Sequence, residues 1–420
     1  MQRPKFFLSL VVLFSVSLSG CGGAGADMGT SGHGSMADSS SAGSGGSSGG
    51  TVTVVSPGGG PVDVSQLPIN EWVAVTPGVE LAPGVATDTT LTGNARNYGN
   101  TTYRPMSGEI VYYEGIQDSN HDIDYYADAI AGWDIDQNRI LIRKVTNWGG
   151  SLYSGGYLLN NFSDDPTPSP RHVYDAFTYV PNRDLIALIL GANSKMVSSS
   201  SSQAARDALN TDNKSTWLYH FSDSSWDRRI DNNIRQFWPS QYDVSPYESH
   251  LHYWPGHDKL IFLDSYGTHG AQYDLATRKW TETTPVNSPP GNVAAGNLYN
   301  ALSTWDRKRD RWVFRSDNSN LFFYDPATRK YSDLPDPPGL SGSGDITYMS
   351  DVDKYLVVGL NGSETWIFDP TTNQWSQIDG GAADFSGGHE RYVEYDDTTG
   401  VVGMVPAVLG GRFYLFRYAQ

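Results

Sequence analysis

The sequence predicts an all-β fold, a six-bladed β-propeller built from four-stranded blades, and three observations support that prediction. The 420-residue chain is rich in aromatic and turn-forming residues, with 25 Tyr, 12 Trp, 45 Gly and 23 Pro, while charged residues make up only 18%. This composition favours many short strands over a helical bundle or a coiled coil. The other two observations are a repeated turn and a regular spacing of aromatic residues, which together divide the chain into six units.

The repeated turn is a short polar segment flanked by two large apolar residues. Its clear copies are residues 273–280 (YDLATRKW), 324–331 (YDPATRKY) and 368–375 (FDPTTNQW), with weaker copies at 133–140 and 219–226. The flanking residues can face each other across a hairpin, on one buried face of a sheet. An aspartate opens the turn in four copies and can accept a bond from a backbone N–H two residues further on. We therefore interpret these residues as turn formers and not as catalysts: Asp134, Asp274, Asp325 and Asp369.

The spacing concerns one aromatic residue in each unit, which we call the anchor. Each anchor is followed five residues later by Gly or Asp and then by an apolar run suited to a strand. The six anchors are Tyr103, Tyr179, Tyr253, Trp305, Tyr348 and Tyr395. In the third, fourth and fifth units the first aromatic residue of the repeated turn follows the anchor by 20, 19 and 20 residues. Each unit therefore predicts two hairpins in series, which is the four-stranded blade of a propeller.

The two ends of the chain predict how the ring closes. The sixth unit supplies strands at about residues 391–395, 401–405 and 412–416, and the chain stops at Gln420 before an outer strand. Near the start, residues 70–76 resemble an outer strand with nothing before them to pair with. We expect this N-terminal strand to complete the last blade, because that pairing removes two exposed sheet edges.

On these motifs, residues 88–420 resemble the kelch-type propellers, including the central domain of the galactose oxidase group. The resemblance is kelch-like only, because the double glycine that follows the second strand in kelch repeats does not recur. Two units carry a single glycine there, Gly191 or Gly359, and the last unit carries Gly410 and Gly411. The copper-radical chemistry of galactose oxidase needs a cysteine cross-linked to a tyrosine. The single cysteine of this chain, Cys21, lies at the N-terminus, so the resemblance implies the fold and not that chemistry.

The first twenty residues predict export. Arg3 and Lys5 precede an apolar segment at 6–16 that is too short to span a bilayer comfortably. The segment 18–21 (LSGC) resembles the bacterial lipobox, in which the signal peptide is cut before a cysteine that then carries acyl chains such as palmitate. The resemblance implies a lipoprotein signal peptide over 1–20 and lipidation of Cys21. The alternative is an ordinary cleaved signal followed by an incidental cysteine.

The residues after Cys21 predict how the folded part is held. Gly22 stands where the lipoprotein inner-membrane retention signal carries Asp, so in the cell envelope we expect the outer membrane rather than the inner one, with a periplasmic or surface-exposed domain. Between Gly22 and Gly50, 19 of 29 residues are Gly or Ser. This composition predicts a flexible tether over 21–62 in front of the propeller at 63–420.

Charge and cysteine content exclude several classes of function. The formal net charge is -17, which disfavours nucleic acid as a partner because phosphates select basic surfaces. One cysteine cannot form an internal disulfide framework or a cysteine-based zinc site. We expect a monomer, and we expect no cofactor other than calcium. One loop carries oxygen ligands at alternate positions: Asp118, Asn120, Asp122 and Asp124. That spacing suits calcium, but the EF-hand Gly and Glu are missing, so a solvated acidic loop is the preferred interpretation.

The innermost strand of each blade lines the central channel, so polar residues near the anchors are candidates for a site. Four of them combine the side chains that a polysaccharide lyase or hydrolase could use as base, acid and carboxylate partner: Arg96, His172, Tyr174 and His250. Further candidates for ligand binding are Tyr98, Glu248, Asn300, His389 and Arg391, beside Asp345 and Glu390. The competing interpretation is that channel strands are polar because the channel is wet.

Taken together, the residues predict a membrane-anchored extracytoplasmic binding module whose ligand is a glycan or an envelope protein. The alternative is a carbohydrate-active lyase or hydrolase with its site at the channel mouth. Fold alone does not separate these two, because one fold hosts many functions.

Overall fold

The computed structural model describes part of the chain. The described residues are 53–56, 58–83, 85, 100–115, 127–147, 167–168, 173, 175–190, 214–229, 234–238, 249–290, 298, 301–316, 320–338, 344–359, 364–378, 391–406 and 412–419. All of them belong to one compact unit, Gly50–Gln420. The signal peptide, Cys21 and most of the tether lie outside the described residues.

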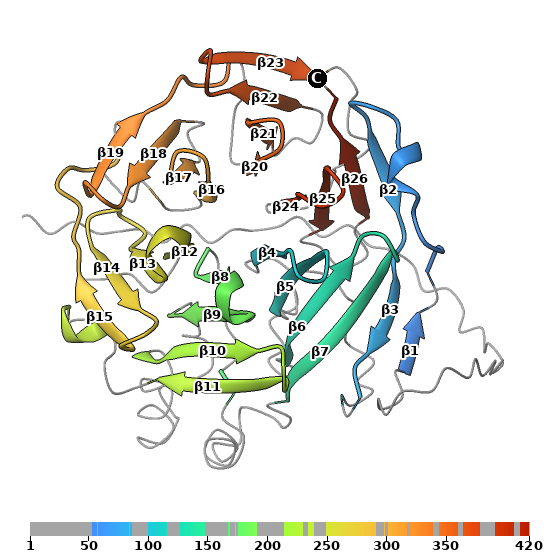
Figure 1. Ribbon diagram of the computed structural model, residues 1–420, viewed down its shortest axis with the longest axis horizontal. Coiled ribbons are helices and arrows are strands. Elements are labelled where there is room, and N and C mark those ends of the chain that lie inside the picture. The colour runs from blue at the N-terminus through green and yellow to red at the C-terminus, as the bar shows by residue number, and fades with distance from the viewer. Residues whose placement is uncertain are drawn as a thin grey trace, which may run out of the picture. The chain divides into compact units, whose positions relative to one another are not determined.

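The described residues form a nearly all-β six-bladed propeller, as the sequence predicts (Figure 1). Each blade contains four antiparallel strands, and its first strand lies nearest the ring axis. Blades II to V each use four consecutive strands. Blade II holds β8 (Phe177–Val180), β9 (Leu185–Ile189), β10 (Thr216–His220) and β11 (Ser225–Arg229). Blade III holds β12 (His250–Trp254), β13 (Lys259–Leu263), β14 (Gly270–Asp274) and β15 (Lys279–Glu282). Blade IV holds β16 (Leu302–Asp306), β17 (Arg311–Arg315), β18 (Leu321–Asp325) and β19 (Lys330–Asp333). Blade V holds β20 (Gly344–Met349), β21 (Lys354–Gly359), β22 (Thr365–Asp369) and β23 (Gln374–Ile378).

The ring closes through the N-terminal strand, which confirms the predicted closure. Blade VI consists of β24 (Arg391–Asp396), β25 (Val401–Pro406), β26 (Phe413–Arg417) and, as its outer strand, β2 (Trp72–Val75), which pairs antiparallel with β26. The Trp72 indole packs on Phe416 and donates a hydrogen bond to Thr365 Oγ1 of blade V at 2.9 Å. The closing strand therefore joins two blades.

Blade I is wider than the sequence predicts. Its four strands are β4 (Asn100–Arg104), β5 (Glu109–Gly115), β6 (Ala127–Asp134) and β7 (Arg139–Asn147). Outside them, β3 (Gly78–Leu81) pairs parallel with β7, and β1 (Thr53–Ser56) pairs antiparallel with β3. The N-terminal segment thus contributes to both blades that meet at the closure. Four single turns of 3-10 helix complete the described elements: Val64–Gln66, Pro181–Arg183, Ile234–Gln236 and Pro255–His257.

The repeated turns behave as predicted. The two apolar residues that flank each turn are direct cross-strand partners, as Tyr273 and Trp280 are in blade III. Asp274 accepts bonds from the backbone N–H groups of Ala276 and Thr277 at 3.0 and 2.7 Å. Asp325 and Asp369 make the same pair of bonds, and Asp134 accepts one from Gln137. These aspartates are turn formers.

The Gly or Asp five residues after each anchor occupies a left-handed backbone position, which explains why only these two residue types stand there. The φ values are 65° at Gly108 and 72° at Gly400, and they lie between 47° and 53° at Asp184, Asp258, Asp310 and Asp353. Gly and Asp tolerate this region better than other residues do. Three of the four aspartates also accept a hydrogen bond from the hydroxyl of their own anchor: Tyr179 to Asp184, Tyr253 to Asp258 and Tyr348 to Asp353.

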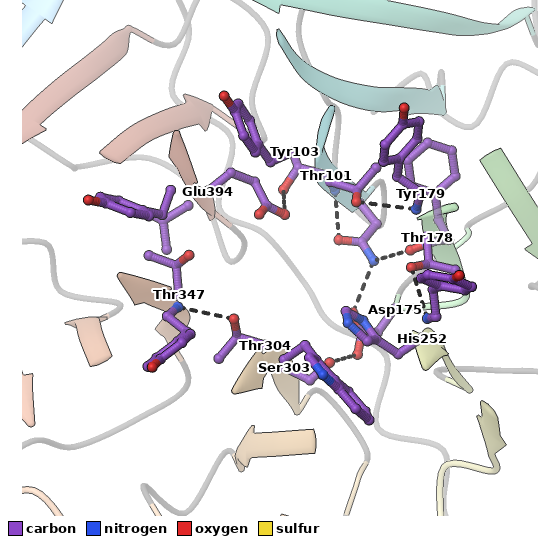
Figure 2. Close-up of a pocket in the computed structure, with 18 of the residues that line it drawn as sticks. Thr101, Tyr103, Asp175, Thr178, Tyr179, His252, Ser303, Thr304, Thr347 and Glu394 are labelled. Carbon is purple, nitrogen blue, oxygen red and sulfur yellow. Dashed lines mark hydrogen bonds between the residues drawn. The ribbon is translucent and has the colours of Figure 1, made fainter. Parts of the chain in front are cut away.

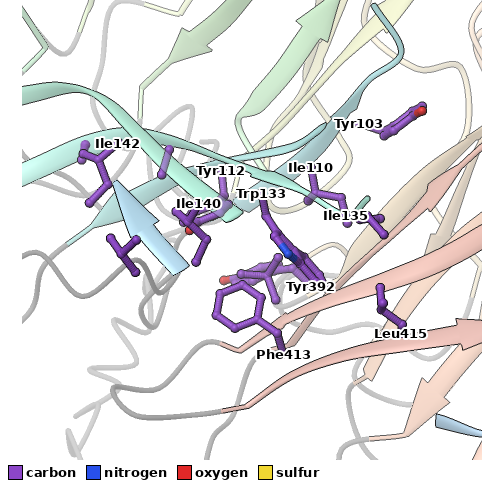
Figure 3. Packing of buried hydrophobic residues seen from close by; sticks show 14 of the residues in the cluster. Tyr103, Ile110, Tyr112, Trp133, Ile135, Ile140, Ile142, Tyr392, Phe413 and Leu415 are labelled. Atoms are coloured by element: carbon purple, nitrogen blue, oxygen red, sulfur yellow. The ribbon is translucent and has the colours of Figure 1, made fainter. Parts of the chain in front are cut away.

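The hydrophobic core lies between neighbouring blades. Between blades I and VI, Trp133 packs edge-on against Phe413 with 4.9 Å between ring centroids (Figure 3). Gly403 on β25 lies where a Cβ atom would be 2.4 Å from Ile110 Cδ1 of blade I. A Cβ atom at this position would force the packing between the two blades to shift.

Strand direction separates two faces of the ring. Because strands alternate in direction, the connections from first to second and from third to fourth strand leave one face, which we call the turn face. The connections from second to third strand, and from blade to blade, leave the opposite face, which we call the loop face. The long first-half insertions begin after β5, β7 and β9 and belong to the loop-face connections, but they lie mostly outside the described residues.

Candidate functional site in the central channel

The six innermost strands enclose a cavity of about 400 Å³ along the ring axis (Figure 2). This size falls within the range of about 300–1,000 Å³ that is common for small-molecule sites. Every blade contributes to the wall, through β4, β8, β12, β16, β20 and β24 and the residues next to them. The channel is therefore the natural place to look for a ligand site.

One repeat position dominates the wall, namely the residue directly before each anchor. In ring order these residues are Thr102, Thr178, His252, Thr304, Thr347 and Glu394, and all six line the cavity. Three of the threonines accept a bond from the backbone N–H of the next blade's anchor: Tyr179 to Thr102, Tyr253 to Thr178 and Tyr348 to Thr304, at 3.3, 3.3 and 3.1 Å. These hydroxyls satisfy backbone donors at the free edges of the innermost strands and tie neighbouring blades together.

A polar cluster lies near the starts of the innermost strands, at the loop-face end of the channel. Asp175 accepts bonds from Asn100 Nδ2 at 3.0 Å and from the Ser303 hydroxyl, and it contacts His250 Nδ1 at 2.6 Å. Ser303 in turn accepts a bond from the Trp312 indole at 2.8 Å. The cluster joins blades I to IV, so we interpret its role as structural, holding these blades together.

His250 is the one proposed catalytic residue that the structure describes. It is fully buried, and its Nε2 donates to the carbonyl oxygen of Leu298 at 2.8 Å while Nδ1 faces Asp175. Ser303 donates to Asp175 and not to the imidazole, so the three side chains are not arranged as a Ser–His–Asp triad. With both ring nitrogens occupied, His250 has none free to take a proton from a ligand in this arrangement.

Burial favours the neutral form of two carboxyl groups on the opposite side of the channel. Burial raises the pKa of Asp345 well above its usual range, although Ile346 and Val393 donate backbone bonds to it. Burial also raises the pKa of Glu394 to about 8, and the bond from Thr101 Oγ1 at 3.1 Å reduces that effect. Near neutral pH a large fraction of Glu394 therefore carries a proton.

His252 is the other titratable residue on the ring of six. Its imidazole is stacked on the Trp305 indole, with 5.2 Å between centroids and 11° between planes. Burial lowers the pKa of His252 to about 3, and the nearby Arg307 acts in the same direction. The imidazole is therefore neutral at physiological pH.

On the turn face, an ion pair crosses the channel mouth. Arg307 Nη1 lies 2.6 Å from Asp397 Oδ2 and joins blade IV to blade VI, which are not neighbours in the ring. Arg307 is the only Arg or Lys among the described residues that line the channel, and this contact already engages it. The described channel wall is thus richer in carboxyl groups than in cationic ones.

Most of the other predicted site residues cannot be placed. Arg96, Tyr98, His172, Tyr174, Glu248, Asn300, His389 and Glu390 lie outside the described residues, as does the calcium candidate loop with Asp118, Asn120, Asp122 and Asp124. Asp345 lines the channel as predicted, and only the backbone of Arg391, at the start of β24, is described. Within the described part of the chain, no cluster of His, Cys, Asp and Glu is arranged to hold a metal ion.

Sequence reasoning missed most of the residues that line the cavity, because its candidates stand three to seven positions before the anchors and the main wall position stands directly before them. The described inner strands begin much nearer to the anchors, for example at Asn100 in β4 and His250 in β12. The signal that could have found the wall is the recurrence of Thr directly before four anchors, interrupted by His252 and Glu394.

Comparisons with known proteins give no family for this chain. No protein-family model matches it, and no curated protein is significantly similar to it. Among the described residues, no helix is long and apolar enough to cross a membrane.

Proposed function

We propose that this protein is a lipid-anchored binding module of the bacterial cell envelope, with a kelch-like propeller that takes a glycan into its central channel. The observation that carries the proposal is the cavity itself, which is walled by hydroxyl, amide, imidazole and carboxyl groups from all six blades. Such convergent polar groups beside aromatic side chains suit a sugar, which offers many hydroxyls and apolar ring faces. An envelope protein bound at the ring face is the other ligand class.

The anchoring part of the proposal rests on the sequence. The lipobox-like segment ends at Cys21, and Gly22 favours the outer membrane. Two or three acyl chains would hold the protein firmly in a bilayer. Labelling cells with radioactive palmitate tests this: we expect label in the wild-type protein and none in Cys21→Ser. Equal labelling of both would refute lipidation at this residue.

The binding part is tested with the full-length protein in detergent on an array of neutral and acidic glycans. We expect a defined subset of glycans to bind and to protect the protein against thermal unfolding. If no glycan binds, the glycan proposal is wrong, and an envelope protein is the ligand class to test next.

A catalytic role has one specific observation in its favour, the protonated state of Glu394. A carboxylic acid that keeps its proton near neutral pH can donate it to the leaving oxygen of a glycosidic bond. Release of reducing ends from a bound glycan tests for hydrolysis, and absorbance of new double bonds in polyuronates tests for a lyase. Loss of either activity in Glu394→Gln, with binding intact, would assign the acid.

A further inference from the structure

The ring of residues before the anchors departs from its own repeat at two places only. Four blades carry Thr at this position, and His252 of blade III and Glu394 of blade VI replace it. Blades III and VI are three steps apart in a ring of six, so the two side chains lie on opposite sides of the channel (Figure 2). The two exceptions are therefore placed symmetrically.

The two exceptions also lack the bond to the next blade's anchor that Thr102, Thr178 and Thr304 accept. Within the described part of the chain, neither ring nitrogen of His252 has a hydrogen-bond partner, and the anchor of the next blade, Trp305, only stacks on the ring. Glu394 uses Oε1 to accept a bond from Thr101, which leaves Oε2 without a described partner. Both side chains are partly exposed to the channel, so their polar atoms are available to a ligand or to water.

We infer that His252 and Glu394 hold the ligand from opposite sides of the channel, and that the ligand group between them is an uncharged, hydroxyl-bearing one such as a single neutral sugar residue. This inference rests on the proposed glycan function and names the contact residues and the class of sugar.

The chemistry of the wall supports an uncharged ligand over an anionic one. A neutral imidazole offers one donor and one acceptor, and a protonated carboxyl group offers the same, so each can bind a hydroxyl in either direction. A uronate would need a cationic partner, but the only one on the described wall, Arg307, is paired with Asp397.

The repeat supplies its own test variants, His252→Thr and Glu394→Thr. Each restores the residue that the fold uses at the other four positions, so a stable ring is expected. Residues kept for binding commonly lower stability, and their replacement commonly raises it. We expect the melting temperature of both variants to equal or exceed that of the wild type. A large loss of melting temperature in both variants would show that the residues serve the fold and would overturn the inference.

Binding is measured by titration calorimetry on the full-length protein, with neutral disaccharides (cellobiose, maltose, lactose) and with a digalacturonate. We expect binding of a neutral disaccharide, and at least a tenfold loss in each Thr variant. The control Glu282→Thr, on the exposed outer strand β15, should bind like the wild type.

The outcomes separate this inference from the proposed function. Unchanged binding in the Thr variants, or preferential binding of the digalacturonate, would overturn the inference and leave the channel glycan function in place. Binding of no sugar by the wild type would overturn both.

Discussion

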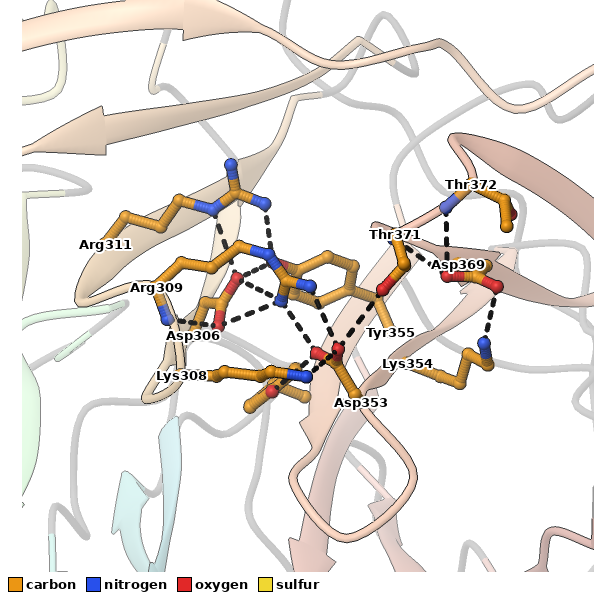
Figure 4. A network of polar contacts seen from close by, with 11 residues as sticks. Asp306, Lys308, Arg309, Arg311, Asp353, Lys354, Tyr355, Asp369, Thr371 and Thr372 are labelled. Atoms are coloured by element: carbon orange, nitrogen blue, oxygen red, sulfur yellow. Dashed lines mark hydrogen bonds and ion pairs between the residues drawn. The ribbon is translucent and has the colours of Figure 1, made fainter.

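At the scale of single residues, the ring is held by polar contacts that a repeat unit cannot make alone. Asp353 shows this most clearly: it accepts bonds from its own anchor Tyr348 and from Lys308 and Arg309 of blade IV (Figure 4). The side chains of Asp353 and Arg309 are partly buried. Partial burial strengthens such pairs relative to exposed ones, because water screens them less.

The Asp353 contacts predict a graded response to substitution. Asp353→Ala removes the carboxylate and its hydrogen bonds. It also places alanine at φ 53°, a left-handed backbone position that alanine disfavours. We therefore expect the unfolding free energy to fall by about 2–4 kcal/mol. Asp353→Asn keeps the left-handed preference and loses only the charge, with an expected cost of about 1 kcal/mol. Urea unfolding measures both. Equal effects of the two variants would show that the backbone position is unimportant.

Glu394 predicts a pH dependence of stability. The folded protein holds this proton up to a pKa of about 8, whereas the ordinary value is 4.5. Between these values the folded state binds more protons than the unfolded state, so this group's contribution to stability falls as the pH rises. Glu394→Gln removes the titration, and the variant should gain stability relative to the wild type from about pH 5 to pH 8. Parallel stability curves for the two proteins would show that burial does not shift this group.

At the scale of elements, the sequence predicted the strands whose residue pattern repeats from blade to blade. It missed the strands that have no counterpart in other blades, such as β3. The turn copies and anchors are found because side-chain alternation and left-handed positions leave a residue signature, such as Asp274 or Gly108. The pairing of β3 with β7 has no such signature, because the burial of Val79 and Leu81 depends on the neighbouring blade. Most of the channel wall was missed for a related reason, because the residue at which a strand begins depends on tertiary contacts.

The closure of the ring predicts that β2 is essential. Deleting residues 63–78 exposes the edge of β26 and removes the contact of Trp72 with blade V. We expect a clear drop in melting temperature by calorimetry. Deleting residues 53–56 removes only the outermost strand of blade I and should lower it less. An unchanged melting temperature after the first deletion would refute closure by this strand.

The contact between blades I and VI predicts a steric effect at a glycine. Gly403→Ala puts a methyl group 2.4 Å from Ile110 Cδ1 and 3.0 Å from Trp133 Cζ3, so the packing must shift. Overpacking of this kind costs about 1–3 kcal/mol. The control Gly256→Ala meets nothing closer than 4.0 Å and should be nearly neutral. Thermal unfolding compares the two, and equal stabilities would contradict the described contact.

At the scale of the whole molecule, the sequence predicted the ring and its closure, while the site had to come from the structure. Six units can be counted along the chain, but which side chains converge on the axis depends on where each strand begins. His252 and Glu394 stand far apart in sequence and share only a repeat position. The structure shows that this position lines one cavity, which is the basis for the proposed function.

The most direct test of that central claim is a crystal structure of the full-length protein with the tightest-binding neutral disaccharide. We expect density for the sugar inside the channel, within hydrogen-bond distance of both His252 and Glu394. Sugar density confined to the outer surface of the ring, with an unoccupied channel, would contradict it.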